Sequence, residues 1–143
     1  MVRLHHLGWV VKDIGRSLCQ LEREGAHAVT AAIADPIQRV TVQFLSDPHS
    51  PVLWELIAPT DRSEDAPLSS RLSRGGGLDH ACFELQESDG TLDRVVEKEI
   101  ERGSFVLCPP TFATAFNRRI AFVFRPSGRL VEFVEARSDA DSL

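Results

Sequence analysis

Apolar and polar residues follow similar patterns in the two halves of the chain, and each pattern predicts a strand, a helix and three further strands. In the first half, apolar runs with a period of two residues predict strands, and a run with a helical period follows Asp13, a typical helix-capping residue. Leu18 and Leu21 mark the inner face of this helix, and Gly25 predicts its end. The predicted elements are strands over 4–11, 28–33, 39–45 and 52–58 and a helix over 13–23.

The pattern begins again after a polar connection over residues 60–77, which ends in three consecutive glycines. We expect one short helical turn near residues 68–72 in this connection. Ser88 or Asp89 is expected to cap the helix of the second half, which runs through Arg102. The predicted strands of this half cover 78–85, 105–108, 119–124 and 129–136, with a loop at Pro109-Pro110 and a polar tail over 138–143.

The first and last strands of the two halves resemble each other in sequence. Leu4-His5-His6-Leu7-Gly8 corresponds to Leu78-Asp79-His80-Ala81-Cys82, an alignment that matches His6 rather than His5 with His80. The last strand of each half carries one glutamate among apolar residues, Glu55 in the first half and Glu132 in the second. A histidine on the first strand and a glutamate on the last, repeated in two halves of similar length, indicate a duplicated unit.

This duplication predicts an α+β fold. A half-sheet with one helix has an apolar face that it cannot bury alone, so we expect two paired βαβββ modules that form a curved, half-open eight-stranded sheet around a metal site. The chain would be one domain over residues 1–143, because its length suits a single core. Its predicted parts are a first module over 1–59, a connection over 60–77, a second module over 78–137 and the tail.

The four repeated polar residues are the candidate site. A carboxylate in the middle of an apolar strand is destabilising unless it is paired or bound to a cation, although each such residue could also face solvent at a strand edge. Two imidazoles and two carboxylates suit Mn, Fe, Co, Ni or Zn, and four protein ligands on a six-coordinate ion leave two positions for water or substrate. The candidate ligands are His6, Glu55, His80 and Glu132.

Composition and charge exclude several other classes. The net charge is −5 and no run of lysine or arginine stands out, so we expect no nucleic-acid partner. The apolar runs are as short as strands and no signal-peptide pattern precedes the first one, so we expect no membrane association. Three cysteines without metal-type spacing fit reduced thiols in the cytoplasm.

Four short motifs resemble the vicinal oxygen chelate superfamily, which includes glyoxalase I, methylmalonyl-CoA epimerase, bleomycin-resistance proteins and extradiol dioxygenases. These motifs surround His6, Glu55, His80 and Glu132, and the resemblance covers nearly the whole chain. The pattern is most similar to methylmalonyl-CoA epimerase, as judged from residues 55–59, the glycine-rich approach to His80 and residues 117–122. The resemblance implies paired βαβββ modules and one divalent metal held by the four candidate ligands.

The resemblance also implies a reaction and further site residues. We expect a metal-dependent isomerase or epimerase that moves a proton at a carbon next to a metal-bound carbonyl, on a small-molecule substrate such as an acyl-CoA, with Glu132 as both ligand and base. Arg119 is a candidate for binding a substrate carboxylate or phosphate. Thr41 stands where the epimerases can carry a second catalytic glutamate, with Gln43 on the same face, and both residues are candidates for substrate binding. Glu84 is a candidate substitute base.

Other functions remain open at this stage. A glyoxalase-type lyase would use the same ligand set. A protein that sequesters a drug or metabolite would have the same fold, although such relatives typically lack the metal ligands. An extradiol dioxygenase is disfavoured, because the fourth ligand would occupy a position that catechol or oxygen needs. We also expect a homodimer, since strand edges and an apolar face would otherwise stay exposed.

Overall fold

The computed structural model describes residues 1–143, and its backbone contacts divide them into two units. The N-terminal unit consists of His6–Asp79. The C-terminal unit consists of His80–Leu143 together with Met1–His5. None of the helices has the length and apolar character that crossing a membrane requires.

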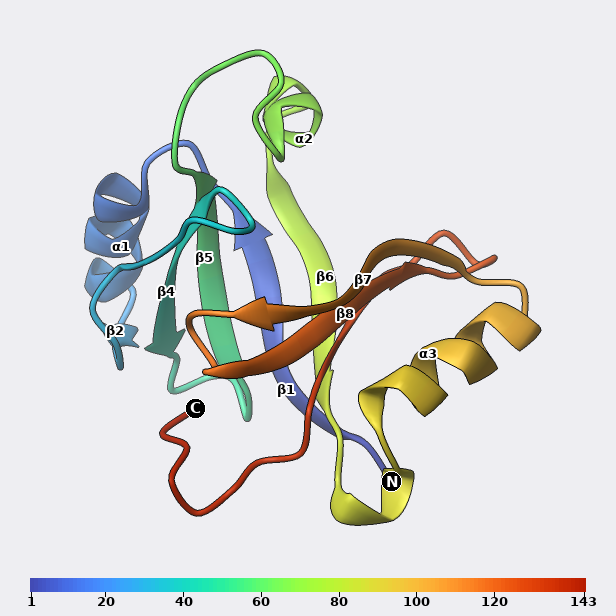
Figure 1. Ribbon diagram of the computed structural model, residues 1–143. Helices are drawn as coiled ribbons and strands as arrows, with labels where there is room; N and C mark the ends of the chain where they lie inside the picture. The colour runs from blue at the N-terminus through green and yellow to red at the C-terminus, as the bar shows by residue number, and fades with distance from the viewer. The chain divides into compact units, whose positions relative to one another are not determined.

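The N-terminal unit is built on a sheet in which β1 runs parallel to β5 and β5 runs antiparallel to β4. Two short strands, β2 and β3, pair with the other side of β4 (Figure 1). Its elements are β1 (Arg3–Val10, whose first residues belong to the C-terminal unit), α1 (Ile14–Arg23), β2 (His27–Ala28), β3 (Ile33–Asp35), β4 (Val40–Ser46), β5 (Leu53–Pro59) and α2 (Ser69–Ser73).

The C-terminal unit repeats this connectivity. Strand β6 runs parallel to β9, β9 pairs antiparallel with β8, and β8 pairs antiparallel with β7. Its elements are β6 (Gly77–Glu84), a 3₁₀ turn (Glu87–Asp89), α3 (Leu92–Glu101), β7 (Phe105–Ala113), β8 (Arg118–Phe124) and β9 (Leu130–Val134). The α+β class and the two βαβββ modules are therefore confirmed.

Helix α1 forms where the local sequence predicts it. The Asp13 side chain accepts a hydrogen bond from the backbone N–H of Arg16 at 2.9 Å, which satisfies one of the free donors of the first turn. Leu18 and Leu21 pack against a buried cluster that includes Leu45 and Leu56 of the sheet. The helix therefore covers the sheet face that bears Leu45 and Leu56, and this face is called the helix face below.

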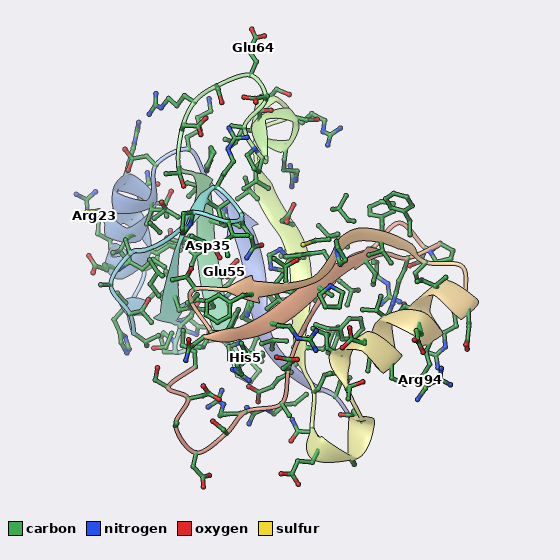
Figure 2. All side chains as sticks on the ribbon, viewed as in Figure 1. His5, Arg23, Asp35, Glu55, Glu64 and Arg94 are labelled. Atoms are coloured by element: carbon green, nitrogen blue, oxygen red, sulfur yellow. The ribbon has the colours of Figure 1, made fainter.

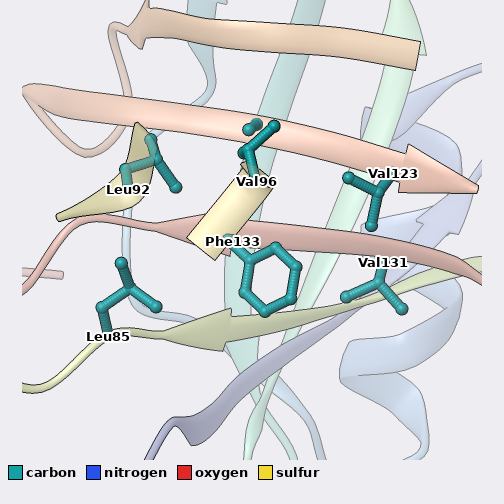
Figure 3. Packing of buried hydrophobic residues seen from close by; sticks show 7 residues of the cluster. Leu85, Leu92, Val96, Val123, Val131 and Phe133 are labelled. Carbon is teal, nitrogen blue, oxygen red and sulfur yellow. The ribbon is translucent and has the colours of Figure 1, made fainter. Parts of the chain in front are cut away.

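Helix α3 covers the corresponding face of the C-terminal sheet. Leu92 and Val96 of this helix pack against Val123, Val131 and Phe133 of the neighbouring strands (Figure 3). Leu92 and Val123 are fully buried. Each unit therefore has its own apolar core between its helix and one face of its sheet.

Three predicted boundaries were wrong. The segment expected to be one strand over 28–33 forms two short pieces, β2 and β3, so the eight expected strands appear as nine. Helix α3 begins at Leu92 rather than after Ser88 or Asp89, because Gly90 adopts a φ of 85° after the 3₁₀ turn and Thr91 caps the helix instead.

The loop predicted at Pro109-Pro110 lies inside β7, which extends to Ala113. Register shifts between Val106 and Thr111 interrupt the pairing of β7 with β8 at this point. Proline has no backbone N–H to donate, and an irregular stretch of a strand tolerates that loss.

Candidate functional site

The N-terminal unit places His6 and Glu55 side by side on two parallel strands. Glu55 of β5 is the backbone partner of Gly8, which lies two residues after His6 on β1, so the two side chains share a face. His6 Nε2 lies 3.6 Å from a carboxylate oxygen of Glu55, and both residues are buried. Figure 2 labels Glu55 on its strand. The ring of Phe44 lies edge-on to His6, with 5.2 Å between ring centroids.

The C-terminal unit contains the same arrangement. Glu132 of β9 is the backbone partner of Cys82, which lies two residues after His80 on β6. His80 Nε2 lies 3.1 Å from a carboxylate oxygen of Glu132, and both residues are buried. Phe122 lies edge-on to His80, with 5.1 Å between ring centroids.

Each unit therefore holds a histidine, a glutamate and a phenylalanine in the same relation. Phe44 and Phe122 are the cross-strand partners of Glu55 and Glu132, respectively. Neither phenylalanine is among the site residues predicted from the sequence, although their matching positions in the two halves are a signal of the repeat. Each pair offers an imidazole nitrogen and a carboxylate oxygen with little access to water, so the donor types fit a borderline divalent metal.

His5 takes a different position from His6. It is buried in the C-terminal unit, where its ring lies edge-on to Phe116 with 5.5 Å between centroids. Successive residues of a strand point to opposite faces, so the two histidines cannot serve one site from the same side. The pairing of His6 with Glu55 agrees with the choice of His6 from the repeat.

Glu84 is enclosed by arginine side chains. Its carboxylate accepts hydrogen bonds from Arg3 at 2.5 Å, Arg118 at 3.1 Å and Arg137 at 3.2 Å. Burial raises the pKa of Glu84, but the hydrogen bonds and positive charges of Arg118 and Arg137 outweigh burial and hold this pKa below its ordinary value. A carboxylate that is ionised and held by three cations is a weak base. This environment argues against Glu84 as the substitute base.

On the face of β4 that bears Phe44, the residues before Phe44 are aliphatic and Ser46 follows it. Phe44 contacts His6, and alternation along the strand puts Val42 and Val40 on the same face. Both valines are buried. This face therefore presents no carboxylate or other titratable group beside the His6–Glu55 pair.

Thr41 and Gln43 lie on the opposite face of β4. Gln43 is the cross-strand partner of Leu56, which belongs to the core under α1, and its side-chain amide donates to the carbonyl of Thr30 at 2.8 Å. Thr41 shares the face of Gln43. The positions of both side chains therefore argue against a role for Thr41 or Gln43 in substrate binding on the histidine side.

Arg119 is engaged by two carboxylates. Its guanidinium lies 2.8 Å from Asp93 and 2.8 Å from Glu135, and these hydrogen bonds raise the pKa of Arg119. The side chain links α3 to the end of β9. This structural ion pair argues against the predicted role of Arg119 in binding a substrate anion.

Two βαβββ sheets with matching buried His–Glu pairs define a duplicated α+β protein with metal-type donors in each half. Residues 5–122 match the model of the glyoxalase/bleomycin resistance protein/dioxygenase superfamily, and the chain belongs to this family. It is 29% identical over 97 residues to the ethylmalonyl-CoA/methylmalonyl-CoA epimerase of Cereibacter sphaeroides, an alignment that covers 66% of this chain and 69% of the relative.

Solved structures show the same fold. A methylmalonyl-CoA epimerase from Mycobacterium tuberculosis is 24% identical with a TM-score of 0.76, over 94% of this chain and 88% of that one. A hypothetical protein from Bacillus halodurans is 22% identical with a TM-score of 0.78, over 97% of both chains. A methylmalonyl-CoA epimerase variant from Streptomyces coelicolor, solved with 2-nitronate-propionyl-CoA, is 21% identical with a TM-score of 0.75, over 96% of this chain and 99% of that one.

Proposed function

We propose that this protein is a metal-dependent enzyme that moves a proton at a carbon next to a carbonyl group of an acyl-CoA. The observation that carries the proposal is the repeated, buried His–Glu pair at matching positions of the two units. The epimerase relative from Cereibacter sphaeroides supports the reaction class. The ligand of the Streptomyces coelicolor structure, an acyl-CoA analogue, supports the substrate class.

In this proposal, His6, Glu55, His80 and Glu132 together hold one divalent ion of the Mn, Fe, Co, Ni or Zn type. Glu55 and Glu132 are each only 4% exposed, and a buried carboxylate is destabilising unless a cation compensates it. The bound ion would stabilise negative charge that develops on a substrate carbonyl oxygen.

Glu132 acts as the base in this proposal. Its carboxylate takes the proton from the carbon next to the carbonyl, and His80 at 3.1 Å orients it. The edge-on ring of Phe122 reduces access of water to His80.

The aliphatic face of β4 limits what this base can achieve. Inversion requires a second group that delivers a proton to the opposite side of the carbon, and Val40 and Val42 cannot do so. We therefore expect exchange of the α-hydrogen with solvent to be faster than full epimerisation. The same observation favours a second candidate, a glyoxalase-type lyase, in which a proton moves between neighbouring carbons on one side of the substrate.

The test is proton NMR in deuterium oxide with metal-loaded protein and a panel of α-chiral acyl thioesters, 2-oxo acids and hemithioacetals. Loss of an α-proton signal should require metal and should slow by about a hundredfold or more in Glu132→Gln. Glu55→Gln should keep most of the exchange at saturating metal, because Glu55 serves only as a ligand. If no compound exchanges and one binds tightly to the metal-free protein, a binding function replaces the enzymatic one.

A further inference from the structure

A cavity lies on the helix face of the N-terminal sheet, on the opposite side from the His6–Glu55 pair. Its volume is about 380 Å³, and the floor is formed by the core leucines of β4 and β5. Trp54 reaches it from β5, since it is the residue before Glu55 and points to the other face. This volume falls within the range of about 300–1,000 Å³ that is usual for small-molecule sites. The lining includes Trp9, Trp54, Gln20, Leu21, Glu24 and Asp47.

Both tryptophans of the chain line this cavity. Their ring centroids lie 5.8 Å apart with an angle of 72° between the planes, so they present two differently oriented aromatic surfaces. Trp9 is 41% exposed, an unusual position for a large apolar ring on a folded sheet. Perpendicular tryptophan faces are a recurrent means of binding organic ammonium groups.

The indole nitrogen of Trp54 lacks a hydrogen-bond partner. Nε1 is buried, and no acceptor in the protein lies within hydrogen-bonding reach. Buried indole N–H groups normally find an acceptor, and those that do not are explained by a missing partner. Since this nitrogen has no accessible surface, a ligand in the cavity meets the ring of Trp54 rather than its N–H.

The charged side chains around the cavity are both acidic. The carboxylate of Glu24 makes no ion pair or hydrogen bond, and that of Asp47 accepts only a backbone N–H, from His49 at 2.8 Å. No lysine or arginine is among the lining residues. The electrostatic preference of the cavity is therefore for a cation.

We propose that this cavity binds a small organic cation, an alkylammonium compound. Its ammonium group lies against Trp9 and Trp54 and is balanced by Glu24 and Asp47. The site uses none of the four proposed metal ligands. Its occupancy can therefore be tested whether or not the proposed reaction is correct.

Choline and its neutral isostere 3,3-dimethylbutan-1-ol are the matched probes, because they have the same shape and hydroxyl group but differ in charge. Intrinsic fluorescence reports directly on this site, since the chain has no tryptophan elsewhere. At constant ionic strength, choline should change the emission saturably and should bind about tenfold more tightly than the neutral alcohol. Equal responses to the two probes, or no saturable response to choline, would overturn the proposal.

A charge-neutral variant tests the carboxylates. Glu24→Gln combined with Asp47→Asn should weaken choline binding about tenfold, whereas Glu22→Gln, an exposed change on the same helix, should leave it unaltered. Unchanged binding in the double variant would exclude the proposed charge pairing.

Two-dimensional ¹H–¹⁵N NMR on the unaltered protein gives a readout that does not depend on folding of a variant. The chain has two indole N–H signals, and the Trp54 signal should move as choline binds, because the cation lies against the Trp54 ring. A stationary Trp54 signal at saturating choline would contradict the proposed contact. If the protein responds to an N-acetylated lysine amide but not to choline, the proposed small-molecule ligand is wrong and the cavity binds a basic peptide instead.

Discussion

Individual buried glutamates in this protein differ in what surrounds them. Glu55 and Glu132 each lie beside one histidine and one phenylalanine ring, whereas Glu84 lies among three arginines. In the first environment a carboxylate oxygen lies beside an imidazole nitrogen, an arrangement that suits a pair of metal ligands. In the second environment, the arginines compensate the negative charge of the ionised carboxylate. The ion pairs connect segments of the C-terminal unit that are distant in sequence. Burial alone therefore does not distinguish a functional carboxylate from a structural one in this chain.

Glu84→Gln tests the structural role. At neutral pH the variant should be less stable by about 3 kcal/mol, because it removes the carboxylate that pairs with buried Arg118 at 3.1 Å and leaves that arginine only the longer pair with Asp141 at 3.8 Å. Urea unfolding measures the difference, and Glu97→Gln, which breaks an exposed pair with Arg94, should change stability by less than about 1 kcal/mol. Similar small effects of both substitutions would contradict the structural role.

The same residue predicts a pH dependence. The pKa of Glu84 in the folded state lies below the value of about 4.3 in an unfolded chain, so its stabilisation is complete above that value. It is lost as the pH falls through the lower, folded-state pKa. The stability gap between the parent and Glu84→Gln should therefore shrink on acidification below about pH 4.3 in a series of urea titrations. A gap that widens on acidification would mean that the pKa is raised instead.

At the scale of elements, the register of one strand decides which side chains reach the histidine face. Pairing of Phe44 with Glu55 and of Gln43 with Leu56 puts Phe44 toward His6 and Gln43 toward the core under α1. A slip of one residue exchanges the faces of the whole strand. The backbone before β6 also requires a particular residue type, because Gly76 adopts a φ of 67° and lies close to the backbone of Val10.

Gly76→Ala tests this close approach. A Cβ at Gly76 would lie 2.5 Å from the carbonyl oxygen of Val10, whereas a Cβ at Gly75 would meet nothing within 4 Å. Both positions have a positive φ, so Gly75→Ala measures the backbone strain alone. We expect Gly76→Ala to lower the unfolding free energy by about 1–3 kcal/mol more than Gly75→Ala, as measured by urea denaturation. Equal losses would show that the backbone moves away without strain.

At the scale of the whole molecule, the proposed metal binding should be visible in the stability of the protein. A ligand that binds only the folded state stabilises it by about 2.7 kcal/mol at a free concentration of one hundred times the Kd. Thermal unfolding with a divalent metal and with a chelator measures this difference. His80→Ala should remove most of the bound metal and of the stabilisation, and His49→Ala, an exposed histidine in the loop before β5, should retain both. Full metal content in His80→Ala would remove His80 from the site.

The expected homodimer also belongs to this scale. Phe105 and Phe124 are cross-strand partners that are 67% and 47% exposed, and Leu107 beside them is 59% exposed. Such an apolar patch is typical of a surface that another molecule covers. Light scattering should give twice the chain mass of 15.9 kDa, and Phe105→Glu should shift the protein toward the monomer. A parent protein that scatters as a monomer at tens of micromolar would contradict the prediction.

The sequence by itself determined the features that depend on neighbouring residues. The period of apolar positions predicted most strands, and Asp13 predicted the start of α1. The sequence repeat predicted that His6 and His80 lie on the first strands of two equivalent halves, each with one glutamate on its last strand. These features are encoded locally, because capping, periodicity and alternation act over a few residues.

Only the tertiary structure decided which partners the remaining site candidates have. Glu84 meets Arg3, Arg118 and Arg137 across 81, 34 and 53 positions of sequence, a separation at which no local pattern signals contact. Gln43 lies on the helix face because of the register in which β4 pairs with β5. A shift of this register by one residue would turn Gln43 to the opposite face. The cavity at Trp9 and Trp54 likewise exists only because α1 packs across strands distant in sequence. Long-range pairing, rather than residue type, separated the candidates that face the histidines from those that do not.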